Sequence, residues 1–198
     1  MLNRLALIAF SCLLFITAPA GAADTASAMA FVQSLGDTAL SSLTDKSLPP
    51  KAREDRTRNL LRKYFDIKTI GRFALGTHWK TATSAEQSEY MGLFEDMIVS
   101  TYASRFGEYS GQSLEVGKSR PIGKRDFIVN SKILQTDGPP VNVDWQVRHK
   151  NGKLKVIDVQ VENVSMLITQ RNEFAAVIQR NGGEVSSLLE TLRKRKGG

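Results

Sequence analysis

Histidine is the side chain best suited to acid–base chemistry and metal binding near neutral pH, and this sequence has only two, His78 and His149. Neither has a cysteine or a second histidine at the spacing of metal ligands. The single cysteine, Cys12, lies in an N-terminal apolar run that we expect to be removed. Cysteine metal sites, thiol catalysis and disulfides are therefore not expected in the mature chain.

Other catalytic patterns are equally sparse. No G-x-S-x-G elbow, P-loop or dinucleotide fingerprint occurs, although a Ser-His-Asp triad stays open because its members need not be close in sequence. Glu95 and Asp96 form an acidic pair, but adjacent residues of a helix point in different directions. Asn163-Val164-Ser165 fits the N-glycosylation pattern, which is a weak three-residue signal. These observations favour a binding protein over an enzyme.

The N-terminus has the three parts of an export signal. A basic "MLNR" precedes the apolar run "LALIAFSCLLFI", and the small residues of "TAPAGAA" follow. We predict a signal peptide over residues 1–22 and a mature domain over 23–198. Cleavage after Ala20 or Ala23 and an uncleaved anchor are the alternatives. Cys12 lies inside the apolar run and not directly after it, which argues against a lipid anchor.

Basic residues exceed acidic ones, giving a formal net charge of +7. The surplus is densest in "RKRK" at 193–196, which we interpret as a solvated C-terminal tail. The alternative is a surface that attracts anionic lipid head groups or an acidic partner. Nucleic acid is not an expected partner of an exported protein.

The first half of the chain has the apolar spacing of helices. We predict helices over 26–43, 49–66 and 67–75, the last ended by Gly76. Thr83 and Glu86 have the spacing of a capping box that opens the longest helix. Along it, bulky apolar residues follow at steps of three and four, with Met97 beside them: Met91, Phe94, Ile98, Tyr102, Phe106 and Tyr109.

The second half changes to the period of strands. Four strands are predicted over 113–123, 126–135, 141–150 and 153–163, with Asn151-Gly152 as a type I′ hairpin turn. In "KVIDVQVENVSM" (155–166), Ile157, Val159 and Val161 would form a dry face. Two helices, over 165–181 and 184–196, end the chain. Helices, then a meander of strands, then helices indicate an α+β fold.

Two stretches of the sequence resemble a known protein family. "YFDIKTIGRFALGTHWKTATSAEQSEYMGLFEDMIVSTYASRF" and "KVIDVQVENVSMLITQRNEF" resemble the MlaC family of periplasmic phospholipid-binding proteins, also called the toluene-tolerance family. The order and approximate spacing of the matching elements agree over roughly residues 30–192. Asn163 stands where many members have glycine, and "TQRNEFAAVIQRNGG" is similar to the hopanoid-associated branch, HpnM.

The resemblance implies a fold and a function. The expected fold is a curved antiparallel sheet of about four strands, NTF2-like, wrapped by N- and C-terminal helices around an apolar cavity. The expected function is a periplasmic carrier, without enzyme activity or cofactor, for phospholipid or a hopanoid-type lipid. Its partners would be an inner-membrane ABC transporter with an MCE-domain subunit and an outer-membrane lipoprotein–porin complex.

Ten apolar residues are the candidates for contact with the lipid, although each is about as compatible with pure core. They are Phe73, Leu75, Phe94, Ile98, Tyr102, Val143, Trp145, Val159, Val161 and Met166. Asp158 and Arg171 interrupt apolar stretches, and we interpret them as a partly buried ion pair that joins helix to sheet. An NTF2-like periplasmic enzyme and a ligand-free assembly factor are the alternatives to a carrier.

Overall fold

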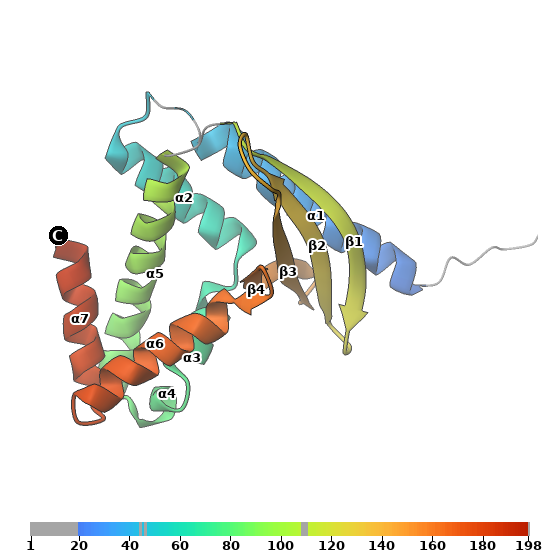
Figure 1. Cartoon of the computed structure of the whole chain (residues 1–198). Helices are drawn as coiled ribbons and strands as arrows, with labels where there is room; N and C mark the ends of the chain where they lie inside the picture. The colour runs from blue at the N-terminus through green and yellow to red at the C-terminus, as the bar shows by residue number, and fades with distance from the viewer. Residues whose placement is uncertain (1–19, 44, 46, 108–110, 198) are drawn as a thin grey trace, which may run out of the picture.

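The computed structural model describes residues 20–43, 45, 47–107 and 111–197. The described chain is an antiparallel sheet with one long helix across it and a group of helices beside it (Figure 1). Residues 1–19 of the predicted signal peptide, and Tyr109 of the predicted stripe, lie outside the described residues, as does the side chain of Phe106.

The helices agree in order with the sequence prediction, with the short α4 as an addition. Pro50 occupies the start of α2, where its missing N–H is harmless, and Gly76 ends α3 with a left-handed φ of 63°. The capping box is confirmed, because Thr83 Oγ1 accepts from the Glu86 N–H and Glu86 accepts from the Thr83 N–H. The helices are α1 Ala20–Leu43, α2 Pro50–Tyr64, α3 Ile67–Leu75, α4 His78–Thr81, α5 Ser84–Gly107, α6 Met166–Arg180 and α7 Val185–Gly197.

The sheet is antiparallel throughout, in the order β1-β2-β3-β4-β5. The four predicted strands are present, and a two-residue fifth strand was not predicted. Asn151 and Gly152 both have positive φ, 52° and 71°, as the predicted type I′ turn requires. The bounds are β1 Ser113–Ile122, β2 Asp126–Leu134, β3 Val141–Lys150, β4 Lys153–Val161 and β5 Val164–Ser165.

The turn between β4 and β5 explains the asparagine where the resemblance led us to expect glycine. Glu162 and Asn163 have φ of 47° and 66°, in the left-handed region. Asparagine adopts this region more readily than most residues other than glycine. The replacement is therefore compatible with the same sharp turn, which returns the chain to β4 and starts α6.

A bulge in β4 corrects the predicted alternation. Asp158 pairs with Gln146, but Val156 pairs with Val147, so Ile157 is an extra residue on this strand. As a result Val156, Ile157 and Asp158 are buried in succession. This run of three departs from the predicted two-residue alternation, although Asp158 itself was interpreted as partly buried. A bulge is decided by pairing across the sheet, so the local pattern does not reveal it.

Two separate hydrophobic cores hold the fold together. In the first, α1 and the end of α2 pack against the sheet. Tyr64 is fully enclosed there, and its hydroxyl hydrogen-bonds the hydroxyls of Ser34 and Thr38 on α1 at 3.0 and 2.8 Å. The buried residues of this sheet core are Ala28, Val32, Leu35, Ala39, Leu60, Tyr64, Phe127, Val129, Val147 and Val156.

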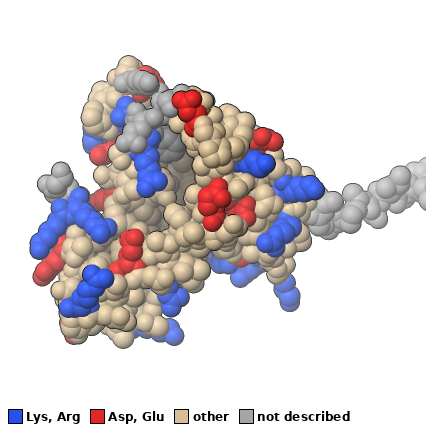
Figure 2. Space-filling model, viewed as in Figure 1, with Lys and Arg blue, Asp and Glu red and all other residues tan. Residues whose placement is uncertain are grey.

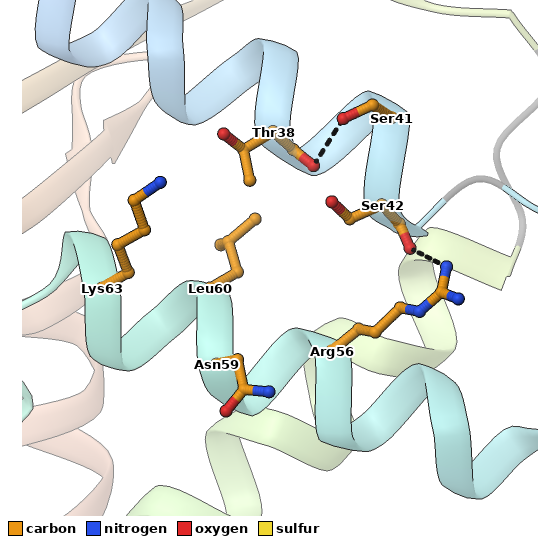
Figure 3. Close-up of a pocket in the computed structure, with 7 residues that line it drawn as sticks. All are labelled: Thr38, Ser41, Ser42, Arg56, Asn59, Leu60 and Lys63. Atoms are coloured by element: carbon orange, nitrogen blue, oxygen red, sulfur yellow. Dashed lines mark hydrogen bonds between the residues drawn. The ribbon is translucent and has the colours of Figure 1, made fainter.

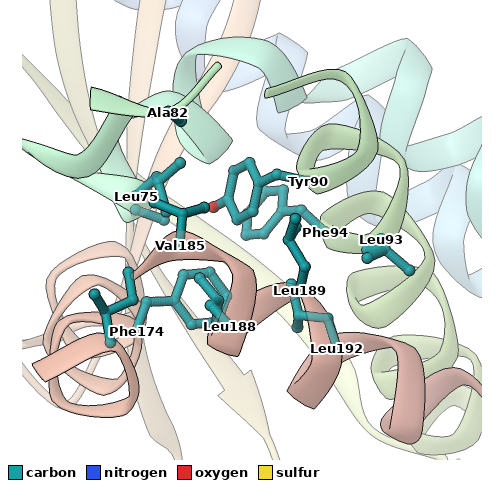
Figure 4. Close-up of a cluster of buried hydrophobic side chains, with 12 residues drawn as sticks. Leu75, Ala82, Tyr90, Leu93, Phe94, Phe174, Val185, Leu188, Leu189 and Leu192 are labelled. Carbon is teal, nitrogen blue, oxygen red and sulfur yellow. The ribbon is translucent and has the colours of Figure 1, made fainter. Parts of the chain in front are cut away.

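The second core joins α3, α5, α6 and α7 without any strand residue among its buried members (Figure 4). At its centre the Phe174 ring meets Tyr90 and Phe94 edge-on, with ring centroids 5.9 and 6.1 Å apart. The Tyr90 hydroxyl, whose pKa is raised by burial, donates to the Gly71 carbonyl oxygen at 2.9 Å. From the other side, α7 contributes Leu188, Leu189 and Leu192.

Asp158 joins the two parts of the molecule, but not as predicted. Its carboxylate accepts from the Ser165 hydroxyl at 2.6 Å and from the backbone N–H groups of Val159 and Leu167 at 2.8 and 3.1 Å. Ser165 is itself the N-cap of α6 and accepts from the Ile168 N–H at 3.0 Å. No ion pair with Arg171 forms. Asp158 instead ties the first turn of α6 to the bulge of β4.

Truncation of Phe174 to alanine should destabilise the protein strongly, because it removes a buried ring that contacts two others. We expect the free energy of unfolding, measured by urea denaturation, to fall by about 3–5 kcal/mol. Phe73→Ala is the matched control, since Phe73 is 42% exposed and the same truncation there should cost less than about 1 kcal/mol. Equal losses in the two variants would contradict this description of the helical core.

Replacement of Asp158 by alanine should weaken the attachment of α6. Three donors lose their acceptor, and the helix N-terminus loses a negative charge, so we expect a loss of about 2–4 kcal/mol. Hydrogen exchange should rise first in the opening turn of α6. Asp137→Ala, in an exposed loop, is the control and should change stability by no more than about 0.5 kcal/mol. Unchanged exchange at Leu167 and Ile168 would show that Asp158 is not the attachment.

Candidate apolar pocket

A pocket of about 410 Å³ lies between the two cores. Its walls come from the end of α2, from α3, α5, α6 and α7, and from the bulge of β4. Apolar side chains at the edges of both cores therefore line this space. The apolar wall residues are Leu61, Phe65, Ile67, Ile70, Phe94, Met97, Ile98, Tyr102, Ile157, Val159, Met166 and Leu167.

The same pocket has a smaller polar part. Four uncharged polar residues and four charged ones line it: Ser100, Thr101, Thr169, Gln170, Arg105, Asp158, Glu173 and Arg195. Asp158 is already bound by three donors, and Glu173 accepts a hydrogen bond from Gln170 at 3.2 Å. The Arg195 guanidinium lies 3.8 Å from the Met97 sulfur. The polar side chains are thus held mostly by neighbours, and the apolar surface dominates.

Tyr102 occupies a mixed environment in this wall. About a third of its surface is exposed, yet desolvation raises the pKa of its hydroxyl. The Arg105 guanidinium, 5.9 Å from the Tyr102 ring centre, opposes that rise, and the Asp158 charge adds to it. The phenol therefore stays neutral at physiological pH and presents an aromatic face to the pocket.

Five of the ten predicted contact residues line this pocket: Phe94, Ile98, Tyr102, Val159 and Met166. The other five lie elsewhere. Leu75 is buried in the helical core, and Phe73 is exposed beneath the Arg171 guanidinium. On the sheet, Val143 is 2% exposed, and the Trp145 indole N–H donates to Ser131 Oγ at 2.9 Å while its ring packs on the sheet core. Val161 pairs with Val143 and Val164.

The sheet contributes less to the pocket than its dry face suggested. Only Ile157, Asp158 and Val159, at the bulge, reach it, while Val156 on the same strand belongs to the sheet core with α1. Sequence reasoning missed Ile67 and Ile70, whose spacing of three was a readable signal of one helix face. It also missed Leu61, Phe65 and Leu167, for which no local pattern distinguishes pocket wall from core.

A second hollow of about 350 Å³ lies between α1 and α2 (Figure 3). It is lined by Thr38, Ser41, Ser42, Arg56, Asn59, Leu60 and Lys63. Arg56 Nη1 donates to the Ser42 carbonyl oxygen at 3.1 Å, so its charge is held against the end of α1. This hollow is more open than the first, and six of its seven lining residues are polar or charged, with Leu60 as the apolar one.

The basic C-terminal segment is not a tail. Residues 193–197 continue α7, and Figure 2 shows Lys and Arg gathered where this helix ends, at the left edge of the view. Arg193 forms an ion pair with Glu89 of α5 at 2.6 Å, and Arg195 lines the pocket. Their side chains are exposed, as predicted, but the segment belongs to the folded unit.

Membrane-spanning helices and clusters of metal ligands are both absent from the residues that the structure describes. Within residues 20–43, 45, 47–107 and 111–197, no helix has the length and hydropathy to cross a membrane. Over the same residues, His, Cys, Asp and Glu side chains do not gather in groups of three that suit a metal ion.

Comparison with known proteins agrees with this geometry. The family model of the MlaC protein matches residues 33–194. The chain is 24% identical over 141 residues to the intermembrane phospholipid transport system binding protein MlaC of Haemophilus influenzae, covering 69% of this chain and 65% of that protein. It is 21% identical over 142 residues to the toluene tolerance protein ttg2D of Pseudomonas putida, covering 71% and 66%. The match thus spans about two thirds of each relative's length.

A solved structure matches over more of the chain. A phospholipid-binding protein from Ralstonia solanacearum, in complex with a phospholipid, aligns with a TM-score of 0.73 and 25% sequence identity. The alignment covers 86% of this chain and 97% of that one. Since the family model covers most of the chain and a structure with this fold is similar over most of its length, the protein belongs to the MlaC family.

Proposed function

We propose that this protein is a periplasmic lipid carrier that holds the acyl part of a phospholipid in the pocket between its two cores. The observation that carries the proposal is the pocket wall, where apolar side chains of four helices and one strand face a shared space. The phospholipid-binding relative from Ralstonia solanacearum supports the class of ligand. The predicted signal peptide over residues 1–22 supports export.

The chemistry of the wall suits a carrier. Each CH₂ group exposed to water costs about 0.8 kcal/mol, so two chains of roughly sixteen carbons would cost on the order of 25 kcal/mol to move unprotected. A dry pocket removes that cost. The contacts in the pocket are non-directional, and the interior of a bilayer offers the acyl chains the same kind of contact. The lipid can therefore leave the pocket for a membrane. Met97 and Met166 add side chains that adapt to irregular ligands.

The pocket volume limits what is held in this conformation. If each methylene group takes the ~30 Å³ that a water molecule occupies in the liquid, the pocket accommodates about one acyl chain. A second chain would require the wall to widen. A hopanoid-type lipid, as in the HpnM branch, is the alternative cargo.

Family membership also supports a proposal for the route of the lipid. The carrier would receive or deliver lipid at an inner-membrane ABC transporter with an MCE-domain subunit and at an outer-membrane lipoprotein–porin complex. Basic groups outside the pocket, including those at the end of α7, would speed encounters with acidic docking sites without adding much affinity.

Protein purified from the periplasm of an expressing Gram-negative bacterium should carry lipid in stoichiometric amount, because the apolar wall favours an acyl chain over water. Native mass spectrometry and solvent extraction measure the occupancy and identify the lipid. A bound phospholipid would support the proposal, and a bound hopanoid would change only the identity of the cargo. Repeated recovery of lipid-free, stable protein would favour an assembly factor, and a hydrolysed lipid would favour an enzyme.

Val159→Glu should empty the pocket, because it places an unpaired carboxylate in the apolar wall. We expect lipid occupancy to fall at least tenfold, while circular dichroism and the urea midpoint change little, since the pocket admits water around the new charge. Lipid occupancy is measured after extraction from the purified variant.

Two controls accompany this variant. Val159→Ala keeps the wall apolar and should retain lipid. Val161→Glu places the same charge two residues along β4 but outside the pocket, so it should also retain lipid. Loss of lipid in both glutamate variants would mean that the strand as a whole, and not the Val159 wall, contacts the cargo.

A further inference from the structure

Large apolar side chains are exposed on one particular face of the protein. Among the described residues only four are markedly exposed: Phe73, Tyr102, Val164 and Ile168. Tyr102 belongs to the pocket wall. The other three lie on α3, β5 and the first turn of α6, at 42%, 53% and 53% exposure. Exposed apolar groups that gather in this way mark an interaction surface.

Contacts across the two helices make this a continuous surface. The Arg171 guanidinium of α6 lies over the Phe73 ring of α3, 5.0 Å from its centre. Ile168 is one helical turn before Arg171, and Val164 lies just before the Ser165 cap of the same helix. We name Phe73, Val164, Ile168 and Arg171, with the cations described next, the α3–α6 face.

Cations lie on the same two helices as Phe73 and Ile168. Lys68 and Arg72 are exposed at positions i and i+4 of α3, and the Arg72 guanidinium lies 5.1 Å from the Trp79 ring centre. Among the residues that the structure describes, no carboxylate forms an ion pair with Lys68, Arg72 or Arg171. Positive charge on this face is therefore not neutralised from within the protein.

The acids nearest in sequence are already occupied. Asp66 accepts from the backbone N–H and the hydroxyl of Thr69 at 3.0 and 2.7 Å. Glu162 accepts from the Asn142 backbone N–H at 2.6 Å. Glu173 of α6 lines the pocket, and the α3–α6 face lies on the other side of that helix from the pocket-lining Thr169, Gln170 and Glu173.

We propose that the α3–α6 face adsorbs to an anionic phospholipid bilayer, with Phe73, Val164 and Ile168 entering the interfacial layer and Lys68, Arg72 and Arg171 meeting the phosphates. An anionic bilayer offers apolar contact to the exposed side chains and negative charge to the cations. Its surface is fluid, so it needs no fixed shape to match this face. The inner side of the same helix pair forms the pocket wall through Ile67, Ile70, Met166 and Leu167. Adsorption would therefore hold at the membrane surface the two helices whose inner side forms the pocket wall.

The test is flotation of the exported protein, recovered from a bacterial periplasm, with vesicles of phosphatidylcholine alone or with one third phosphatidylglycerol. Binding should require the anionic lipid and weaken as salt rises. Lys68→Gln/Arg72→Gln should lower the partition coefficient on the order of tenfold, because each cation near an anionic surface contributes several-fold. Val164→Ser/Ile168→Ser should lower it at least threefold.

The matched control is Lys124→Gln/Arg125→Gln, which removes the same two charges at the exposed turn between β1 and β2. It should leave the partition coefficient within twofold. An equal loss in this control would mean that binding follows net charge and would overturn the proposal. Absence of binding to protein-free anionic vesicles would also overturn it, and capture only by vesicles that contain membrane proteins would assign the face to a protein partner. These outcomes of the flotation experiment do not depend on whether the pocket carries lipid.

Discussion

The structure depends on one buried carboxylate. Asp158 sits at the bulge of β4 and receives hydrogen bonds from the next strand residue, from the Ser165 hydroxyl and from the first turn of α6. Because a buried carboxylate is tolerated only when its oxygens are bonded, the position of α6 relative to the sheet is narrowly defined. Together with the packing of α5 on α2 and of α3 on β4, this attachment positions the helical core and one wall of the pocket relative to the sheet.

The separation into two cores is the second constraint, and it creates the pocket. The sheet core is closed by α1, and the helical core is closed by α7, so each is packed without the other. Phe94 belongs to the helical core and Val159 packs on the sheet core, yet both face the space between. A pocket built between two finished cores can change its content without loss of either core, which is what a carrier needs.

Many features of this fold were predictable because they are local. The capping box of Thr83 and Glu86, the end of α3 at Gly76 and the Asn151-Gly152 turn each depend on a few neighbouring residues. The pocket was predictable only in part. The predicted stripe on α5 includes Phe94, Ile98 and Tyr102, which line the pocket because a helix presents one face in one direction. On α3, the sequence pattern does not separate Leu75, which the helical core covers, from Ile70, which faces the pocket.

The sequence by itself determined the class of fold, the order of its elements and the lack of histidine and cysteine at metal-ligand spacing, since these follow from residue types and short periods. The tertiary structure decided the rest. A strand side chain is shielded from water both when it packs in the sheet core with α1, as Val156 does, and when it lines the pocket, as Val159 does. Only the tertiary structure shows which of the two it contacts. The basic end of the chain likewise became part of α7 through the Arg193–Glu89 pair with α5, a contact between residues 104 positions apart.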